Sequence, residues 1–318
     1  MSFLTIFTSP KPFTHSPHID MIQRNTVQAM MKLGPEVDAL LIGDEEGMAE
    51  ASRQLGIRHI SNVRRNQYGT PLVSSIFEQA RQNSASPFLA CINADNLVMP
   101  DFVEAVKQVA SQEPRFILVG QRWDVDILEP IDFSQGWDER LRQDILKRGV
   151  LRTPGCSDFF VFPRDFYADI HPFALGRSGW DNWMIYWARR QGWKVIDVTA
   201  SVMVGHQNHD YSHLPKNEPP YRLPESQENI RMGGGRRTIF SILDATHRLV
   251  NGRIEPIPLS WKRFWRELEI FPLIKLRRFP ALAFFLANLS FAILHPKQAL
   301  GEWRPYLAKV KRRLLGKV

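Results

Sequence analysis

Two polar side chains that are able to bind a cation follow a short apolar segment, residues 88–92. Asn93 and Asp95 come directly after this segment and are two positions apart. Residues two apart on an extended backbone project to the same side, and carboxylate or amide oxygens suit hard divalent cations. The spacing therefore predicts a divalent-cation site at the end of a buried strand, with an ordinary Asx turn as the alternative.

Another carboxylate comes much later in the chain. Asp181 opens an aromatic-rich segment that is predicted to be helical to about residue 191. A carboxylate there can take a proton from a substrate hydroxyl, or it can simply cap the helix. The helix dipole is expected to lower the pKa of Asp181, so its use as a base depends on its placement.

Three histidines lie within eight residues, at positions 206, 209 and 213. They follow an apolar segment, residues 194–204, that predicts one long strand or a strand pair. Imidazole nitrogens bind transition metals, whereas a histidine in a loop is more often only solvated. His206 is nearest the end of the strand and is the predicted ligand, with His209 and His213 as its rivals in a loop over 205–213.

The elements that must position these residues alternate along the first half of the chain. Short apolar segments predict strands, and segments with helical spacing lie between them. The predicted strands are 3–8, 37–42, 58–60, 88–92 and 116–120, and the predicted helices are 18–33, 48–55, 72–81 and 101–111. This order predicts an α/β fold with a mixed, mostly parallel sheet and helices on both faces, and the loops after the strands should share one edge.

The second half of the chain has a different character. Residues 158–162 predict another strand, and the polar segment 216–237, with its Pro and Gly clusters, predicts a mobile loop or lid. The charge of the chain changes at about residue 250, and the residues after this point are strongly basic. We therefore predict a main domain over 1–250 and a basic helical region over 251–318.

The order of three motifs resembles that of known enzymes. Asn-Ala-Asp at 93–95, Gly-Trp-Asp-Asn at 179–182 and Gly-His at 205–206 resemble glycosyltransferases of the GT-A (Rossmann-like) fold, the nucleotide-diphospho-sugar transferases similar to family 2. The resemblance covers residues 3–211. It implies that Asp95 is the main metal ligand, Asp181 the base and His206 the late ligand of Mn²⁺ or Mg²⁺. Asn93 replaces the first acid of the family's D-x-D motif, which implies a contact with the donor's ribose or with a metal-bound water.

The resemblance also implies a reaction. A sugar would move from a nucleoside diphosphate sugar to a hydroxyl of a glycan or lipid-linked acceptor, with inversion in a single displacement. A sugar nucleotidyltransferase is one alternative, although the loop after the first strand lacks the Gly-rich sequence that cradles a triphosphate. A non-catalytic, membrane-associated binding protein of the same fold is the other.

The remaining predicted contacts come from the loops after the strands. Each of these residues has a structural alternative, as a turn residue, or as part of the core in the case of the tryptophan. The donor contacts are Thr8, Asp44 and Asn66, together with Asn93 and Asp95. The acceptor contacts are Asp158, Trp180 and Asn182.

The positive charge of the chain is concentrated near the C-terminus. Residues 253–318 hold fourteen Lys or Arg and four Asp or Glu, while the whole chain has a formal charge of +8. The apolar segment 279–296 is shorter than the roughly twenty residues that span a bilayer. It predicts either a membrane-surface element that meets anionic lipid or an ordinary helical subdomain with a basic face.

Other classes of function have less support. Nucleic-acid binding rests only on the basic tail, so it ranks below the other readings. Only two cysteines are present, and no secretory signal opens the chain. These features favour a cytoplasmic protein, with the inner face of the membrane as the place where a basic tail would bind.

Overall fold

The structure is a computed structural model that describes residues 2–155, 157–209, 220–302 and 304. The chain divides into two compact units. The first comprises the described residues of Met1–Ala188 and Trp193–Ile257, and the second those of Arg189–Gly192 and Pro258–Val318.

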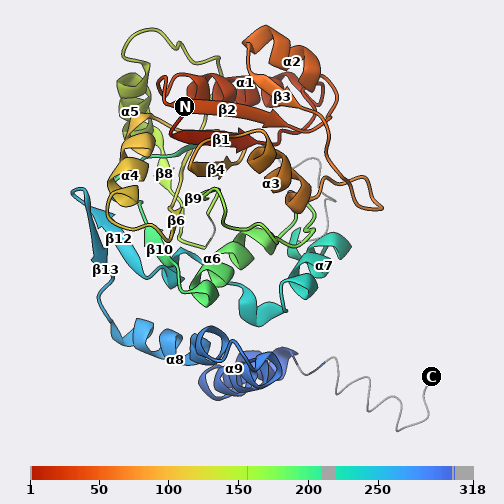
Figure 1. Cartoon of the computed structure of the whole chain (residues 1–318), viewed down its shortest axis with the longest axis vertical. Coiled ribbons are helices and arrows are strands. Elements are labelled where there is room, and N and C mark those ends of the chain that lie inside the picture. The colour runs from red at the N-terminus through yellow and green to blue at the C-terminus, as the bar shows by residue number, and fades with distance from the viewer. Residues whose placement is uncertain (1, 156, 210–219, 303, 305–318) are drawn as a thin grey trace. The chain divides into compact units, whose positions relative to one another are not determined.

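A nine-stranded sheet forms the centre of the first unit (Figure 1). Its strands, in spatial order, are β13 (Arg253–Pro256), β12 (His247–Val250), β10 (Lys194–Asp197), β6 (Phe116–Val119), β9 (Phe159–Pro163), β4 (Phe88–Ile92), β1 (Leu4–Thr8), β2 (Val37–Ile42) and β3 (Arg58–Ile60). Neighbouring strands are parallel except that β9 is antiparallel to β4 and β6, and β13 is antiparallel to β12. The predicted mixed, mostly parallel sheet is confirmed.

Helices cover both faces of this sheet, as the sequence predicts. The helices of the chain before residue 258 are α1 (Pro17–Met31), α2 (Met48–Leu55), α3 (Val73–Gln82), α4 (Pro100–Ala110), α5 (Trp137–Arg148), α6 (Trp180–Gln191) and α7 (Pro224–Met232), with short 3₁₀ helices η1 (Pro220–Arg222), η2 (Arg236–Thr238) and η3 (Ile242–Asp244).

Side chains that alternate along a strand show which helices cover each face of the large sheet. Ile6 of β1 packs in one cluster with Met30 of α1 and Phe102 of α4. Phe7 points the other way, and its ring lies 5.3 Å from that of Phe77 of α3. Successive side chains of a strand point to opposite faces, so one strand serves two cores.

A second, smaller sheet lies at the edge where the polar loops meet. Its strands, in order, are β5 (Asn96–Leu97), β11 (Gly205–Gln207), β7 (Trp123–Val125) and β8 (Val150–Leu151). The prediction of a loop over 205–213 is wrong for 205–207, which form β11; residues 210–213, including His213, lie outside the described part of the chain. Such short strands carry too little pattern to be distinguished from loops in the sequence.

The predicted lid over 216–237 is also wrong where the structure describes it, because residues 224–232 form α7. Asn229 holds this helix in place: its Oδ1 accepts from the backbone N of Ala174 at 2.8 Å, and its Nδ2 donates to the Ala174 carbonyl at 3.0 Å. α7 is polar because little of it is buried, so its sequence resembles that of a loop. Residues 216–219 lie outside the described part.

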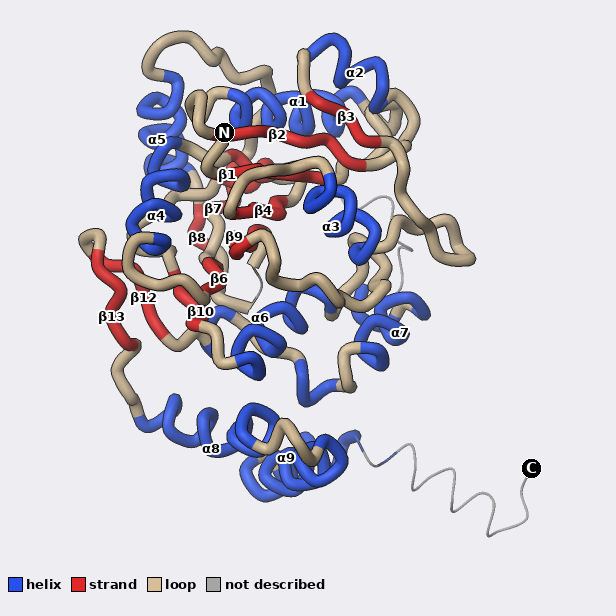
Figure 2. The backbone as a smooth tube through the Cα atoms, viewed as in Figure 1, coloured by secondary structure: helices blue, strands red, loops and turns tan. Residues whose placement is uncertain are grey.

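The second unit contains two helices that pack on one another, α8 (Trp261–Lys275) and α9 (Pro280–Leu294). Figure 2 shows both as helices, with a short connection between them. Among the described residues, neither these helices nor any other is both long and apolar enough to cross a bilayer.

Candidate metal centre and active site

The antiparallel strand β9 brings two predicted site residues together. Ile92, the last residue of β4, pairs with Phe159, the first of β9. The next residues therefore meet: the backbone N of Asn93 donates to the Asp158 carbonyl at 3.0 Å, and the Asn93 Nδ2 donates to Asp158 Oδ1 at 3.0 Å. Strands β4, β9 and β6 lie side by side in Figure 2. Asn93 is thus fixed by Asp158, and its amide nitrogen faces that carboxylate.

Asp95 meets two histidines across the smaller sheet. The register of β11 places His206 opposite Asn96 of β5 on one side and Asp124 of β7 on the other. The Nε2 atoms of His206 and His209 lie 3.7 and 3.1 Å from Asp95 Oδ2. One ligand atom from each of these three residues lies within 4.8 Å of the others. The structure therefore brings Asp95 and His206 together, and adds His209.

The donor set of this cluster fits a divalent transition metal. Asp95 Oδ1 is buried and has no hydrogen-bond partner among the described residues. Burial lowers the pKa of His206 in spite of the nearby Asp95 carboxylate, which favours the neutral imidazole that a metal needs. One carboxylate and two imidazoles suit Mn²⁺ better than Mg²⁺, which prefers oxygen ligands.

Two further charged residues, which the sequence patterns did not indicate, lie beside the cluster. Asp124 Oδ1 lies 3.4 Å from His206 Nδ1 and accepts from Arg122 Nε at 2.9 Å. Arg122 also pairs with Asp158 through Nη1. Burial by itself would lower the pKa of Arg122, but Asp158 and Asp124 raise it. Both residues come just after β6, so charged residues following a buried strand were the available signal.

The pKa values of two carboxyl groups in this network are shifted from their usual values. Burial raises the pKa of Asp158, and the charge of Asp95 adds to this effect against the opposing influence of Arg122. Burial also opposes ionisation of Asp95, yet the hydrogen bond from His209 and the charges of His206, His209 and Arg122 bring its pKa below the usual value. The pKa values of Asp95 and Asp158 are therefore shifted in opposite directions.

Asp181 is the second residue of α6, in the first turn of the helix. Its Oδ1 is buried without a hydrogen-bond partner in the described chain. Burial raises the pKa of Asp181 to about 6, the charge of Asp158 adds to this, and backbone N–H groups near the helix start only partly offset it. The prediction of a lowered pKa is wrong, because the helix-dipole argument holds for an exposed carboxylate and this one is buried.

The predicted donor contacts lie at the ends of the strands but are already engaged in different ways. Thr8 is buried at the end of β1, and its Oγ1 has no hydrogen-bond partner within the described residues. Asp44 pairs with Arg65. Asn66 holds a turn, because its Oδ1 accepts from the backbone N of Tyr68 and Thr70 at 2.9 and 3.0 Å.

The predicted acceptor contacts around α6 point mainly inward. Trp180 is 7% exposed, and its ring lies 6.0 Å from Phe160 and 6.5 Å from Phe77. This is the core position that the sequence left open as the alternative. Asn182 donates from Nδ2 to the Phe240 carbonyl at 2.6 Å.

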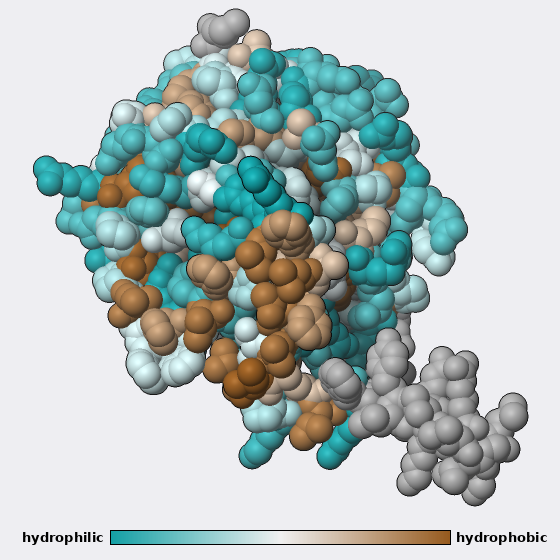
Figure 3. Space-filling model, turned by 60° about the horizontal axis from the view of Figure 1, so that its bottom comes forward, coloured by the Kyte–Doolittle hydropathy of each residue, from teal (hydrophilic) through white to brown (hydrophobic). Residues whose placement is uncertain are grey.

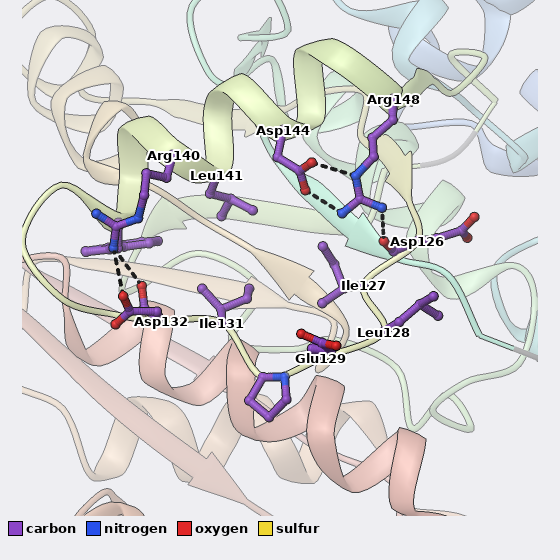
Figure 4. Close-up of a pocket in the computed structure, with 12 residues that line it drawn as sticks. Asp126, Ile127, Leu128, Glu129, Ile131, Asp132, Arg140, Leu141, Asp144 and Arg148 are labelled. Atoms are coloured by element: carbon purple, nitrogen blue, oxygen red, sulfur yellow. Dashed lines mark hydrogen bonds and ion pairs between the residues drawn. The ribbon is translucent and has the colours of Figure 1, made fainter.

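A surface pocket of about 460 Å³ begins two residues after Asp124 (Figure 4). Its floor is apolar, with Ile127, Ile131 and Leu141, and two ion pairs, Asp132–Arg140 and Asp144–Arg148, stand at its rim. None of the metal-cluster side chains lines this pocket. One of its lining residues, Asp126, accepts a hydrogen bond at Oδ1 from Asn208 Nδ2 of the loop after β11 at 2.8 Å. The chemistry therefore belongs to the cluster and not to the pocket.

Comparison with known proteins gives similarity at the level of architecture. No family model matches the sequence, and no curated protein matches it. Similar solved structures include GalNAc-T7 with UDP, GalNAc and Mn²⁺ (14% identity, TM-score 0.46, 72% of this chain and 47% of that one). Others are a putative nucleotide-diphospho-sugar transferase from Desulfovibrio desulfuricans (13%, 0.42, 73% and 95%) and a mannosyltransferase from Pyrobaculum calidifontis with GDP-Man and Mn²⁺ (10%, 0.42, 93% and 88%).

Sugar transferases are among these similar structures. That is the class whose motif order the sequence resembles. The chain spans about half the length of GalNAc-T7. With identities of 10–14% and TM-scores below 0.5, the likeness carries no residue role to this chain, and a function must be argued from the site itself.

Proposed function

We propose that the protein is a metal-dependent glycosyltransferase that moves a sugar from a nucleoside diphosphate sugar to a hydroxyl group of a glycan or lipid-linked acceptor. The observation that carries the proposal is the cluster of Asp95, His206 and His209, with a buried carboxylate oxygen that has no hydrogen-bond partner in the described chain. A second buried carboxylate, Asp181, is coupled to the same network through Asp158.

The cluster is suited to a diphosphate leaving group. Asp95, His206 and His209 would hold Mn²⁺, or less readily Mg²⁺, and the bound ion would neutralise the charge that builds on the departing diphosphate. Asp124 Oδ1 lies 3.4 Å from His206 Nδ1, on the side of the ring away from Asp95, and a hydrogen bond between them on metal binding would orient the imidazole with Nε2 toward the ion. A carboxylate behind a histidine ligand fixes its tautomer and makes it a better donor.

Asp181 is proposed as the general base. With a pKa of about 6, it is ionised at neutral pH and still a stronger base than an ordinary aspartate. It would take the proton from the acceptor hydroxyl as that oxygen bonds to the anomeric carbon and the bond from this carbon to the diphosphate oxygen breaks. A single displacement of this kind inverts the anomeric centre.

We also propose that the polar residues at the strand ends contact the donor sugar nucleotide. Thr8 has the strongest support, because its buried hydroxyl lacks a partner in the described chain at the end of β1. Asp44 and Asn66 would need to exchange their present partners for ribose or base hydroxyls. Asn93, held by Asp158, would present its remaining amide oxygen to the donor or to a metal-bound water.

Thermal stabilisation by nucleotide sugars tests the proposal. A panel of UDP and GDP sugars should raise the melting temperature of the protein more with Mn²⁺ than without it, because ligands that bind only the folded state stabilise it. Asp95→Ala should lose the Mn²⁺-dependent part of this shift. Asp169→Ala, at an exposed carboxylate of the same unit, is the matched control and should keep it.

Product analysis distinguishes the reaction from its alternatives. A transferase releases a nucleoside diphosphate and forms a glycoside of inverted configuration, whereas a nucleotidyltransferase releases pyrophosphate. If none of the nucleotide sugars stabilises the protein with Mn²⁺, and none is consumed, the proposed function is wrong.

A further inference from the structure

Helix α9 has its large apolar side chains on the outside. The residues it buries are small, Ala283 and Ala287. Leu282, Phe285, Leu289 and Ile293 are 48, 65, 47 and 68% exposed, and their spacing places them along one stripe of the helix. No residue of α9 is charged. A helix of a soluble protein normally has the opposite arrangement, with its large apolar face turned inward.

Helix α8 is arranged in the same way. Trp261, Phe264, Trp265, Leu268 and Phe271 are between 36 and 74% exposed. Their positions follow the helical repeat, so they share one face of α8. The rings of the first three lie within 5.9 Å of one another and form an exposed aromatic cluster.

A charged residue occupies the inside of this helix pair. Glu269 of α8 is 7% exposed. It accepts from Arg266 at 2.9 Å, and its other oxygen lies 3.1 Å from Nε2 of His295, the residue that follows α9. This contact ties the end of α9 to α8. The outward apolar faces therefore belong to a fixed pair of helices and not to two helices that have come apart.

The two helices and the segments next to them carry exposed basic residues. Lys262, Lys275, Arg277, Arg278 and Lys297 are exposed, and residues 258–304 contain eight Lys or Arg and three Asp or Glu. Figure 3 shows hydrophobic side chains gathered over one continuous part of the surface. Contiguous exposed apolar surface of this extent marks an interaction site.

We propose that the α8–α9 pair binds the surface of an anionic lipid bilayer. The apolar faces would enter the boundary between headgroups and acyl chains, the two tryptophans would sit at headgroup level, and the basic residues would meet lipid phosphates. α9 is 15 residues and so about 22 Å long, too short to span the hydrocarbon core but sufficient to lie along its surface. The excess of Lys and Arg over Asp and Glu in residues 258–304 favours an anionic membrane over an apolar protein partner. The proposal holds whether or not the protein transfers a sugar.

Binding of the full chain to vesicles tests this inference. Vesicles of phosphatidylcholine mixed with phosphatidylglycerol should sediment the protein, and vesicles of phosphatidylcholine alone should do so less. Phe285→Ser combined with Leu289→Ser should weaken binding on the order of 100-fold, because two large side chains would no longer enter the lipid. Lys262→Glu combined with Lys297→Glu should remove much of the preference for phosphatidylglycerol.

A matched control uses exposed leucines of the first unit. Leu146 and Leu243 are 58 and 57% exposed, and replacing both with Ser should leave vesicle binding unchanged. Thermal unfolding of all variants checks that the exposed substitutions keep the fold. The inference is overturned if the wild-type protein ignores the mixed vesicles, or if Phe285→Ser with Leu289→Ser binds them as well as wild type. It is also overturned if the wild-type protein is a dimer that does not bind vesicles and Phe285→Ser with Leu289→Ser makes it a monomer. The apolar face would then be a subunit interface.

Discussion

Two half-buried carboxylates near one edge of the sheet, each with a buried Oδ1, have opposite electrostatic surroundings. Asp95 lies among His206, His209 and Arg122, and these groups bring its pKa below the usual value although burial opposes this. At Asp181, burial and the charge of Asp158 raise the pKa to about 6. Burial alone therefore does not decide what a carboxylate can do. The charges around it make one a ligand and the other a base.

The largest effect is expected at Asp95. Asp95→Ala removes the only anionic ligand of the proposed metal site, so transfer should fall about 1,000-fold, the scale of the charge stabilisation that a metal ion supplies. Measuring kcat/KM across Mn²⁺ concentrations checks this. Normal turnover of the variant at ordinary Mn²⁺ concentrations would mean that Asp95 is not the metal ligand, and the proposed difference between the two carboxylates would be wrong.

Loss of Asp181 should slow the chemistry and spare the metal. Asp181→Asn should lower kcat at least 100-fold, the scale of general base catalysis, while Mn²⁺ binding stays as in the wild type. In the wild type, kcat/KM should fall as the pH drops below about 6, because the base becomes protonated. Steady-state rates from pH 5 to 8 measure this decrease. If the same decrease persists in the Asn variant, it is due to another titrating group.

A smaller effect is expected behind the metal ligand. Asp124 lies against His206 Nδ1, so Asp124→Asn should weaken Mn²⁺ binding by about 10- to 100-fold, as substitutions behind metal-bound histidines do. Titration of Mn²⁺ by calorimetry gives the affinity. Asp126→Asn, two residues further along the chain, serves as the comparison and should bind Mn²⁺ normally.

The last prediction concerns stability rather than activity. The folded-state pKa of Asp181 is raised from 3.8 to about 6, so its ionised form destabilises the fold. This penalty is absent below the unfolded-state pKa and develops as the pH rises through the folded-state pKa. Asp181→Asn cannot ionise, so its stability relative to wild type should increase by about 2 kcal/mol between pH 4 and pH 8. Urea unfolding at both pH values measures the free energy of unfolding of the two proteins. If their difference is the same at pH 4 and pH 8, burial does not raise the pKa of Asp181.

The strand and helix pattern was predictable because buried strands and amphipathic helices have strong periods. β2, α2 and β3 have the predicted bounds. The short strands β5, β7 and β11 were not predictable, because two or three residues carry no period. These are the strands that assemble the metal cluster, so Asp124 and Arg122 were missed and His209 ranked below His206.

The fold class and the polar residues at the strand ends were fixed by the order of residues alone, because hydrophobic periodicity and chain direction are local properties. Which side chains meet was decided by the tertiary structure. The antiparallel entry of β9 set Asp158 against Asn93, and the register of β11 set His206 between Asp95 and Asp124. The ionisation of Asp181 was decided there too, because a pKa depends on burial and on charges brought near by folding, and neither is visible along the chain.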